Sequence, residues 1–490
     1  MAAETLEDHL RRATRNFTAR LPEDQAIALG RDLARALERA HAETPPQHPV
    51  LDPASIDWEN GAPRLRPGGA GDASEDLFQL GAFVAWLATG QRPEPSWRLD
   101  GPPDAPLSSL TRRAVLAALA TPARSERFAS AAEAADALEA ALQAPSGGAP
   151  PWPLFRGGPD RTATRPQSPV TSLAPAWNAR IGAVAASPVV SASLVVCPTA
   201  DGRLVFLDRA SGRRVHEMRL GSAVESTPGL DAETAHVGTD DGDLVGINTL
   251  SGEETYRLKM GQLVRASPLP VDGRVFVGVV DGKAGALAAV EKGRLLWTRK
   301  LGSVFSSPAL AGDRVLVGSD DGALHAVDRA KGAVLWSVEI GGKVRATPAV
   351  AEDRVVVGGF DGRVAAIALA DGAVLWTRAL GHALYSSPCI ADGLCVFGCH
   401  EGHLHALDLE TGTPQFETAT RGPVISSPAA AGDAFLAGST DGDLYLVDRT
   451  GRVRAHQTLS RRGVPSSPAL DGARVYVGSG DGLHALELVR

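Results

Sequence analysis

The sequence has few cysteines and aromatic residues and no long apolar run. Only four cysteines occur among 490 residues, too few for a disulfide framework in a chain of this size. No apolar stretch approaches the roughly 18 residues of a membrane-spanning helix, and the first residues contain no apolar core of a signal peptide. We therefore expect an intracellular, cytoplasmic protein with no membrane span.

Acidic residues outnumber basic ones. The formal net charge is -8, from 49 Lys and Arg against 57 Asp and Glu. Because nucleic-acid binding depends on a broad basic surface that neutralises phosphates, this balance argues against a nucleic-acid partner.

What the sequence does contain is a repeat of 40 residues. A Ser/Thr-Pro step recurs without interruption, and an Asp-Gly step follows the same spacing, with Glu401 replacing the aspartate once. A period of this length is typical of propellers and solenoids. The repeat prolines are Pro188, Pro228, Pro268, Pro308, Pro348, Pro388, Pro428 and Pro468.

Each repeat has the pattern of one four-stranded blade. In residues 304–341, four short apolar runs are separated by turn sequences that contain Gly or Asp. Eight such units predict an all-β, eight-bladed β-propeller. The last unit ends after its third strand, and residues 174–182 supply the missing one, so an N-terminal strand is expected to close the last blade. Trp177 would then correspond to Trp336.

Some repeat positions predict packing. A ring-bearing residue about twelve positions before the proline is expected to hold one blade against the next. The Ser or Thr before the proline is expected on the innermost strand, with its hydroxyl bonded to local backbone. The ring-bearing residues are Trp177, His216, Tyr256, Trp297, Trp336, Trp376, Phe416 and His456.

The residue three positions before each proline varies from repeat to repeat, whereas its neighbours keep the same residue types. It should lie at the mouth of the central channel. Aromatic residues and arginine are common at binding hot spots, so the slot is a candidate partner-binding surface; ordinary variation at a rim is the alternative. The candidates are Glu225, Arg265, Phe305, Arg345 and Tyr385, whereas the other blades carry Ala185, Ile425 and Pro465.

The sixth repeat raises the question of a metal site. Thiols and imidazoles are the ligands that zinc prefers. However, His405 and Cys399 occupy slots that hold His325 and Ser319 in another repeat, so packing explains them without a metal. We therefore predict no metal site. The residues in question are Cys389, Cys395, Cys399, His400, His403 and His405.

The chain before the repeats has the sequence pattern of helices and not of strands. Helical periodicity is expected from Pro22 to His41, over 76–89, near 107–120 and over 130–143. We predict a mostly α-helical domain over 1–143, a Pro/Gly-rich linker and lead-in over 144–173, and the propeller over 174–490.

The repeats, with the lead-in WPLFRGGPDRTATRP, resemble the PQQ-like β-propeller repeat family, which includes quinoprotein dehydrogenases and non-enzymatic scaffolds. In that family the enzymes use an adjacent cysteine pair, calcium ligands and a catalytic Asp on long loops. This chain has no adjacent cysteines and minimal repeats. The resemblance therefore implies the scaffold branch, with no cofactor.

Residues 1–143 resemble a degenerate C-terminal lobe of a Ser/Thr protein kinase, most clearly in SEDLFQLGAFVAWLATGQRP. Phosphoryl transfer in that family needs a catalytic-loop Asp, a nearby Asn and a DFG Asp. Val50 and Ser55 stand at the first two places and Pro67-Gly68-Gly69 at the third. The resemblance thus implies a lobe without its catalytic residues.

We therefore expect a non-catalytic protein-interaction scaffold, not an enzyme, with a protein partner and no catalytic residue. Two alternatives stay open. One is an enzyme, either a PQQ-dependent dehydrogenase or an atypical kinase, and the other is a small-ligand sensor in the propeller channel. The sequence does not indicate the oligomeric state.

Overall fold

The computed structural model divides into two compact units, Met1–Ala149 and Pro150–Arg490. We describe each by itself. The described residues are 23–42, 56–59, 62–65, 76, 79, 80, 84, 130–143 and 152–490, apart from 166, 167, 232, 233, 250 and 283.

The described part of the first unit contains two helices and a hairpin. Helix α2 (Glu23–His41) and helix α5 (Ala131–Gln143) pack together, and an ion pair joins Arg35 to Asp136. Strands β1 (Ile56–Glu59) and β2 (Ala62–Leu65) form the hairpin. At the end of α2, His41 Nε2 lies 2.8 Å from Oδ2 of the buried Asp76.

The remaining helical predictions for this unit fall mainly outside the described residues. The helix expected near 107–120 lies outside them completely, and that over 76–89 does so for most of its length. The resemblance to a kinase lobe, and the domain limits expected from the sequence, therefore stay predictions.

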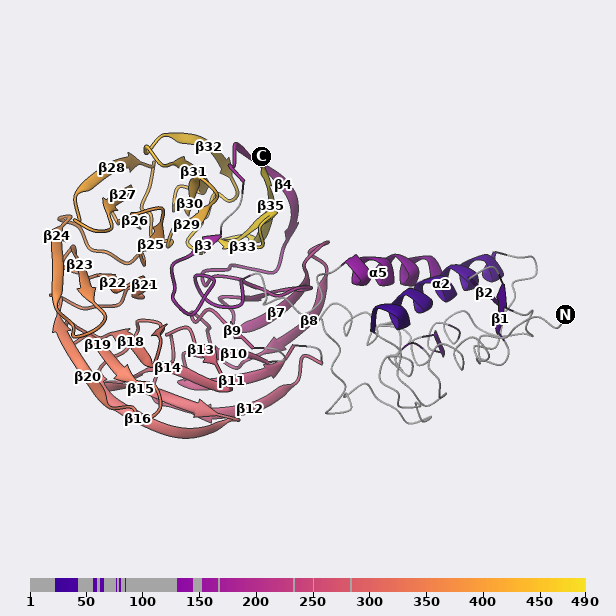
Figure 1. The fold of residues 1–490 in the computed structure, drawn as a ribbon, viewed down its shortest axis with the longest axis horizontal. Helices are drawn as coiled ribbons and strands as arrows, with labels where there is room; N and C mark the ends of the chain where they lie inside the picture. The colour runs from indigo at the N-terminus through magenta and orange to yellow at the C-terminus, as the bar shows by residue number, and fades with distance from the viewer. Residues whose placement is uncertain are drawn as a thin grey trace. The chain divides into compact units, whose positions relative to one another are not determined.

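The second unit is a ring of eight blades, as predicted (Figure 1). Blade 1 contains β5 (Val189–Val190), β6 (Leu194–Pro198), β7 (Arg203–Asp208) and β8 (Arg214–Arg219), and blade 2 contains β9 (Gly229–Leu230), β10 (Thr234–Gly238), β11 (Asp243–Asn248) and β12 (Glu254–Lys259). Blade 3 contains β13 (Leu269–Val271), β14 (Arg274–Asp281), β15 (Ala284–Glu291) and β16 (Arg294–Gly302), and blade 4 contains β17 (Ala309–Ala311), β18 (Arg314–Gly318), β19 (Ala323–Asp328) and β20 (Val334–Glu339).

Blades 5–8 follow the same order, from the innermost strand outward. Blade 5 contains β21 (Ala349–Ala351), β22 (Arg354–Gly358), β23 (Arg363–Ala368) and β24 (Val374–Ala379), and blade 6 contains β25 (Cys389–Ala391), β26 (Leu394–Gly398), β27 (His403–Asp408) and β28 (Pro414–Ala419). Blade 7 contains β29 (Ala429–Ala431), β30 (Ala434–Gly438), β31 (Asp443–Asp448) and β32 (Val453–Thr458), and blade 8 contains β33 (Ala469–Leu470), β34 (Arg474–Ser479), β35 (Gly482–Val489) and β4 (Ser172–Ala179).

The turn residues explain why each repeat folds into one blade. In blade 4, Gly322 turns the chain between β18 and β19 with φ of 90°, a conformation that favours glycine. Asp328 ends β19, and its carboxylate accepts the backbone N–H of Lys331 at 2.7 Å. The two middle strands are buried along most of their length, whereas β20 alternates between exposed and half-buried residues.

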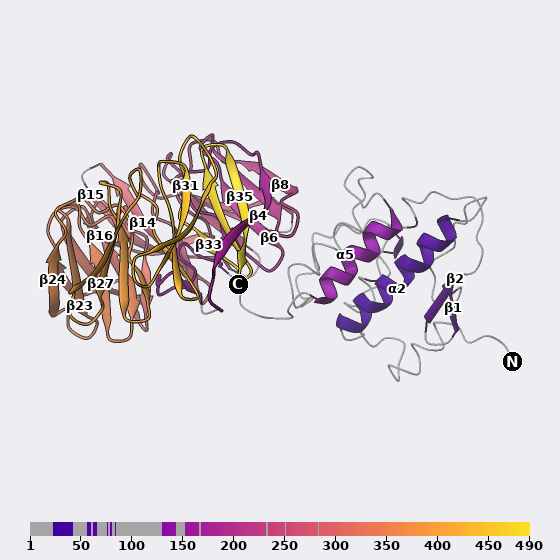
Figure 2. The same cartoon turned by 90° about the horizontal axis from the view of Figure 1, so that it is seen from above.

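The N-terminal strand closes the ring, which confirms the sequence prediction. Strand β4 pairs antiparallel with β35, and the two strands lie side by side in Figure 2. Trp177 faces Ala485 in this pairing, as Trp336 faces Ala326 in blade 4. This closure pairs the free edge of β35, which would otherwise be open to other chains.

Tryptophans of the outer strands join neighbouring blades. Trp336 Nε1 donates a hydrogen bond to the carbonyl of Leu369 in the next blade, at 3.2 Å. Trp376 does the same to Leu409 at 3.0 Å. A glycine lies under each ring, and for Trp336 it is Gly372, where an added Cβ would lie 3.0 Å from the indole. These positions therefore act in packing, as expected.

A closed ring of hydrogen bonds joins all eight blades. The backbone N–H of each Ser or Thr before a repeat proline donates to the hydroxyl oxygen of the equivalent residue in the next blade, at 2.9–3.3 Å. These residues lie just before the innermost strands, and their hydroxyls serve the neighbouring blade, unlike the local role expected. The ring residues are Ser187, Thr227, Ser267, Ser307, Thr347, Ser387, Ser427 and Ser467.

Substituting one ring residue should weaken the propeller measurably. Ser387→Ala leaves the buried N–H of Thr347 without its acceptor, which should lower the free energy of unfolding by about 1–2 kcal/mol. Ser387→Thr keeps the hydroxyl, as in two native repeats, and should stay close to the wild type. Denaturant unfolding followed by tryptophan fluorescence measures both. Equal stability of the two variants would contradict a structural role for the ring.

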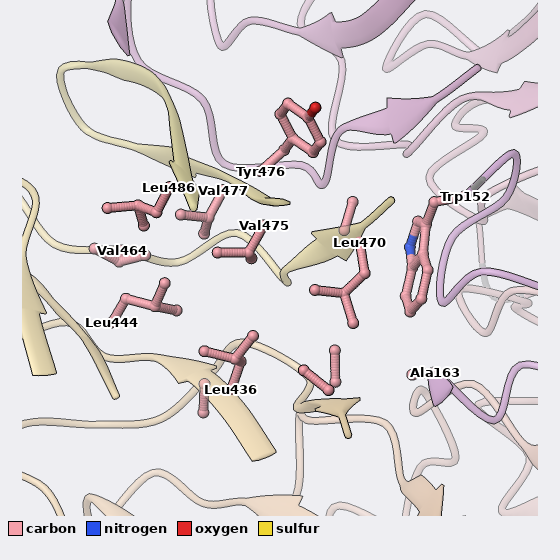
Figure 3. Close-up of a cluster of buried hydrophobic side chains, with 14 of the residues drawn as sticks. Trp152, Ala163, Leu436, Leu444, Val464, Leu470, Val475, Tyr476, Val477 and Leu486 are labelled. Atoms are coloured by element: carbon pink, nitrogen blue, oxygen red, sulfur yellow. The ribbon is translucent and has the colours of Figure 1, made fainter. Parts of the chain in front are cut away.

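The lead-in segment runs inside the ring, where we call residues 152–165 the plug. Figure 1 shows it, in purple, passing inside the blades to β3 (Thr164–Arg165), which pairs in parallel with β29. Trp152 is buried and lies beside Leu470 of blade 8 (Figure 3). This segment was expected to belong to a linker and lead-in, and its place inside the ring was not predicted.

Backbone hydrogen bonds fix the plug to six blades. Its carbonyls accept the N–H of the second residue after each repeat proline, at 2.8–3.0 Å, from Val190, Leu230, Leu310, Val350, Ile390 and Ala430. Blade 3 has Pro270 at this position, which has no N–H to donate. There the plug instead uses a side chain, since Arg161 Nη2 reaches the carbonyl of Pro268 at 3.4 Å.

Two buried arginines belong to the plug. Arg161 also donates to the carbonyls of Pro308 at 2.9 Å and Phe155 at 2.5 Å, and Arg156 donates to that of Pro388. Burial lowers the pKa of Arg156 to about 10 and that of Arg161 to about 9. Both values lie above neutrality, so both side chains stay cationic at pH 7 and hold the inner strands through their backbone carbonyls.

Candidate functional site

The five residues predicted at the channel mouth lie two positions before the hydroxyl ring in the chain, whereas the residues that contact the plug follow the ring. Since all the innermost segments cross the ring in one direction, mouth and plug lie on opposite sides of it. Tyr385 and Glu225 are exposed, and Arg265, Phe305 and Arg345 are half-buried. The structure thus leaves all five side chains accessible to solvent.

A second variable position faces the predicted one. It lies twelve residues after each repeat proline and holds Asp240, Val280, Asp320, Phe360 and His400 in blades 2–6. Except for Val280, these side chains contact the residue three before the proline in the same or the following blade. This position was not predicted from the sequence, although it also varies between repeats while its neighbours keep the same residue types.

The first group of contacts is ionic. Arg265 forms a bidentate pair with Asp240, with Nε–Oδ1 2.9 Å and Nη2–Oδ2 2.7 Å. Its Nη1 lies 2.9 Å from Oε2 of Glu225 in the preceding blade. The hydrogen bonds to Asp240 raise the pKa of Arg265 above its ordinary value. Two of the predicted residues, Glu225 and Arg265, are therefore in direct contact.

The second group combines a cation with aromatic rings. Asp320 holds Arg345 in a bidentate pair at 2.8 and 2.7 Å, which raises the pKa of the arginine. The guanidinium lies over the ring of Phe305 at 4.0 Å and over that of Phe360 at 5.3 Å. This arrangement fixes the long arginine side chain between two rings.

The aromatic contacts continue into blade 6. Phe360 and Tyr385 have ring centroids 4.4 Å apart, and Tyr385 and His400 are 5.9 Å apart. Tyr385 remains 51% exposed, so it presents a large ring to solvent while its neighbours hold its position. The structure therefore joins Phe305, Arg345 and Tyr385 into one surface.

The mouth is asymmetric. Blades 2–6 supply its charged and aromatic side chains, whereas blades 7, 8 and 1 carry small or aliphatic residues at the first position and small ones at the second: Ile425 and Thr440, Pro465 and Gly480, Ala185 and Ala200. A ring built only for stability would not need such a difference between its halves. We call the two positions in blades 2–6 the mouth surface: Glu225, Asp240, Arg265, Val280, Phe305, Asp320, Arg345, Phe360, Tyr385 and His400.

The cysteines of blade 6 are buried, and two of its histidines, His403 and His405, have ring centroids 5.9 Å apart. All four cysteines of the chain are free and buried, and Cys389 Sγ lies 3.6 Å from the carbonyl of Ala163 in the plug. Within the described ranges, no three His, Cys, Asp or Glu side chains are grouped so that they could hold a metal ion.

Burial should make Cys389 unreactive in the folded protein. It raises the pKa of the thiol to about 11, so only about one thiol in a thousand is ionised at pH 8. Iodoacetamide at pH 8 should label no cysteine of the native protein and all four after denaturation. Glu410→Cys places a thiol at an exposed position and should react at once, as a control. Mass spectrometry reads the result, and rapid native labelling of Cys389 would contradict it.

Comparison with known proteins agrees with this fold. A family model described as the β-propeller of the beta-alanine-activating enzyme matches residues 183–488, more than half of the chain. The chain belongs to this propeller family. No curated protein sequence matches it. Within the described residues, neither helix has the length and apolar character needed to cross a membrane.

Solved structures show the same fold at low identity. BamB from Moraxella catarrhalis is 17% identical, with a TM-score of 0.58 over 64% of this chain and 99% of BamB. The quinohemoprotein alcohol dehydrogenase of Comamonas testosteroni is 12% identical, with a TM-score of 0.61 over 71% of this chain and 82% of that enzyme. The computationally designed protein Ika8 is 19% identical, with a TM-score of 0.56 over 65% and 99%.

Proposed function

We propose that this chain is a non-catalytic protein-interaction scaffold, and that the mouth surface of its propeller binds the partner. One observation carries the proposal: the two variable positions concentrate aromatic and charged side chains on one half of the mouth. Tyr385 offers exposed aromatic area, and Arg345 is held between two rings with little freedom left to lose. Such pre-ordered anchors are typical of binding hot spots.

The proposal includes the first unit as a kinase-derived adaptor that has lost its catalytic residues, and a cytoplasmic location. The support is the sequence resemblance, with Val50 and Ser55 at the catalytic places. The purified protein should show neither ATP hydrolysis nor dye reduction with added PQQ and calcium. ATP hydrolysis above buffer, or dye reduction that a mouth variant such as Arg345→Ala abolishes, would overturn the non-catalytic assignment.

Site-specific crosslinking tests the binding surface. A photoreactive phenylalanine at position 385 should give a discrete adduct in the native cell, and the same group at Leu335, exposed on β20, should not. Phe360→Ala with Tyr385→Ala should then lower the affinity for the captured partner by about 10- to 100-fold. Unchanged affinity, or equal adducts from both positions, would refute the assignment of the mouth.

A further inference from the structure

Two arginines of the mouth surface are held in the same way by the blade before them. Nε and Nη2 of Arg265 contact the two carboxylate oxygens of Asp240, and the same atoms of Arg345 contact those of Asp320. The third nitrogen of Arg265, Nη1, lies 2.9 Å from Oε2 of Glu225. The chain itself therefore supplies a second carboxylate to this guanidinium.

The corresponding nitrogen of Arg345 has no such partner. Phe305 precedes Arg345 by one repeat, as Glu225 precedes Arg265, so a ring stands where the second carboxylate would be. Within the described residues, Nη1 of Arg345 makes no hydrogen bond or ion pair, and it is not among the buried unpartnered atoms. The side chain is 30% exposed. Nη1 is therefore a cationic donor that solvent, and a ligand, can reach.

The charges around Arg345 are not balanced. Lys343, whose side chain is 54% exposed, places Nζ 3.5 Å from Oδ2 of Asp320, so a single carboxylate faces two cations. At Arg265 the balance is the reverse, with two carboxylates on one cation. One further carboxylate would make the group at Arg345 neutral, and carboxylates form strong, charge-assisted hydrogen bonds with guanidinium groups.

We propose that Arg345 and Lys343 bind the carboxylate of an acidic residue in the protein partner, as the chain's own glutamate binds the equivalent arginine. The inference rests on the proposed function and names the chemistry of the partner. Beside the guanidinium, the rings of Phe360 and Tyr385 lie 4.4 Å apart, and Tyr385 is exposed. An aromatic residue next to the acidic one would cover this surface.

Fluorine NMR on the full-length protein provides the test. The chain has four tyrosines, so labelling with 3-fluorotyrosine gives four signals, and Tyr385→Phe identifies the one at the mouth. The probes are Ac-Gly-Glu-Phe-Gly-amide and the same peptide with glutamine in place of glutamate. We expect a saturable shift of the Tyr385 signal, with half-saturation at about tenfold lower concentration for the glutamate peptide, because only its carboxylate forms a charge-assisted hydrogen bond. Equal half-saturation, or no saturable shift with either peptide, would overturn the proposal.

Substitutions of Phe305 supply the missing carboxylate from the chain. Phe305→Glu copies the arrangement at Arg265 and should occupy Nη1 of Arg345, so the two peptides should then bind equally. Phe305→Gln removes the ring without adding charge and should keep the preference for the glutamate peptide. Arg345→Met should lose the preference, and Arg213→Met, on an exposed turn, should bind like the wild type. A preference that persists in Arg345→Met would refute the site.

The outcomes distinguish this inference from the proposed function. If the captured partner binds Phe305→Glu at wild-type affinity but not the Phe360/Tyr385 double variant, the carboxylate inference fails and the mouth assignment stands. If the glutamate peptide is preferred but positions 385 and 335 give equal adducts in the cell, the mouth assignment fails alone. Half-saturation by free 3-phenylpropionate at much lower concentration than by the peptide would identify a small carboxylate as the ligand and overturn its assignment to a protein.

Discussion

Replacing Arg161 with methionine is expected to lower the free energy of unfolding of the propeller by about 3–5 kcal/mol. Arg161 is completely buried and donates to the carbonyls of Phe155, Pro268 and Pro308. Methionine fills a similar volume but leaves these buried carbonyls without donors, and each hydrogen bond to a charged group contributes about 1.5–3 kcal/mol. Two well-formed bonds are enough to give the expected loss.

Denaturant unfolding of the purified variant measures this loss. Arg213→Met is the matched control, because Arg213 lies exposed in the turn before β8, and such surface changes stay within about 0.5 kcal/mol. If Arg161→Met unfolded at the same denaturant concentration as Arg213→Met, the plug would not be part of the folded ring, and its placement inside the channel would be wrong.

Removing residues 1–181 is expected to abolish the soluble propeller. This truncation deletes the plug and β4 together, so blade 8 keeps three strands and β35 presents an unpaired edge along its length. Exposed strand edges promote pairing between chains. The product should aggregate, and any soluble fraction should lack a cooperative thermal transition.

Removing residues 1–149 provides the comparison. This shorter truncation ends at the boundary of the two compact units and keeps both the plug and β4. It should remain monodisperse in size-exclusion chromatography and melt cooperatively. A folded, monodisperse protein lacking residues 1–181 would show that neither the plug nor the N-terminal strand is needed for closure.

Much of the propeller could be predicted because its signals are local. The 40-residue period sets the number of blades, and the Gly and Asp turn residues mark the strand ends. Even the closing strand was predictable, since the last repeat lacks a strand and Trp177 has an identifiable counterpart in Trp336. The mouth candidates followed from the same alignment of the repeats.

The plug could not be predicted for a physical reason. Its sequence has no period, and its partners are carbonyl and N–H groups of the backbone, which every residue possesses. Its contacts reach from Val190 to Ala430, so no short-range pattern reports them.

Pro270 makes one blade of the near-symmetric ring differ from the others at the position that contacts the plug. A segment that runs around the inside of eight similar blades could in principle bind in several rotational settings if every blade offered the same backbone donor. One blade without that donor, matched by the stretch of plug between Pro153 and Pro159 that bonds to the blades on either side of it, removes this degeneracy. Pro270 thereby distinguishes one rotational setting of the plug within the ring from the others.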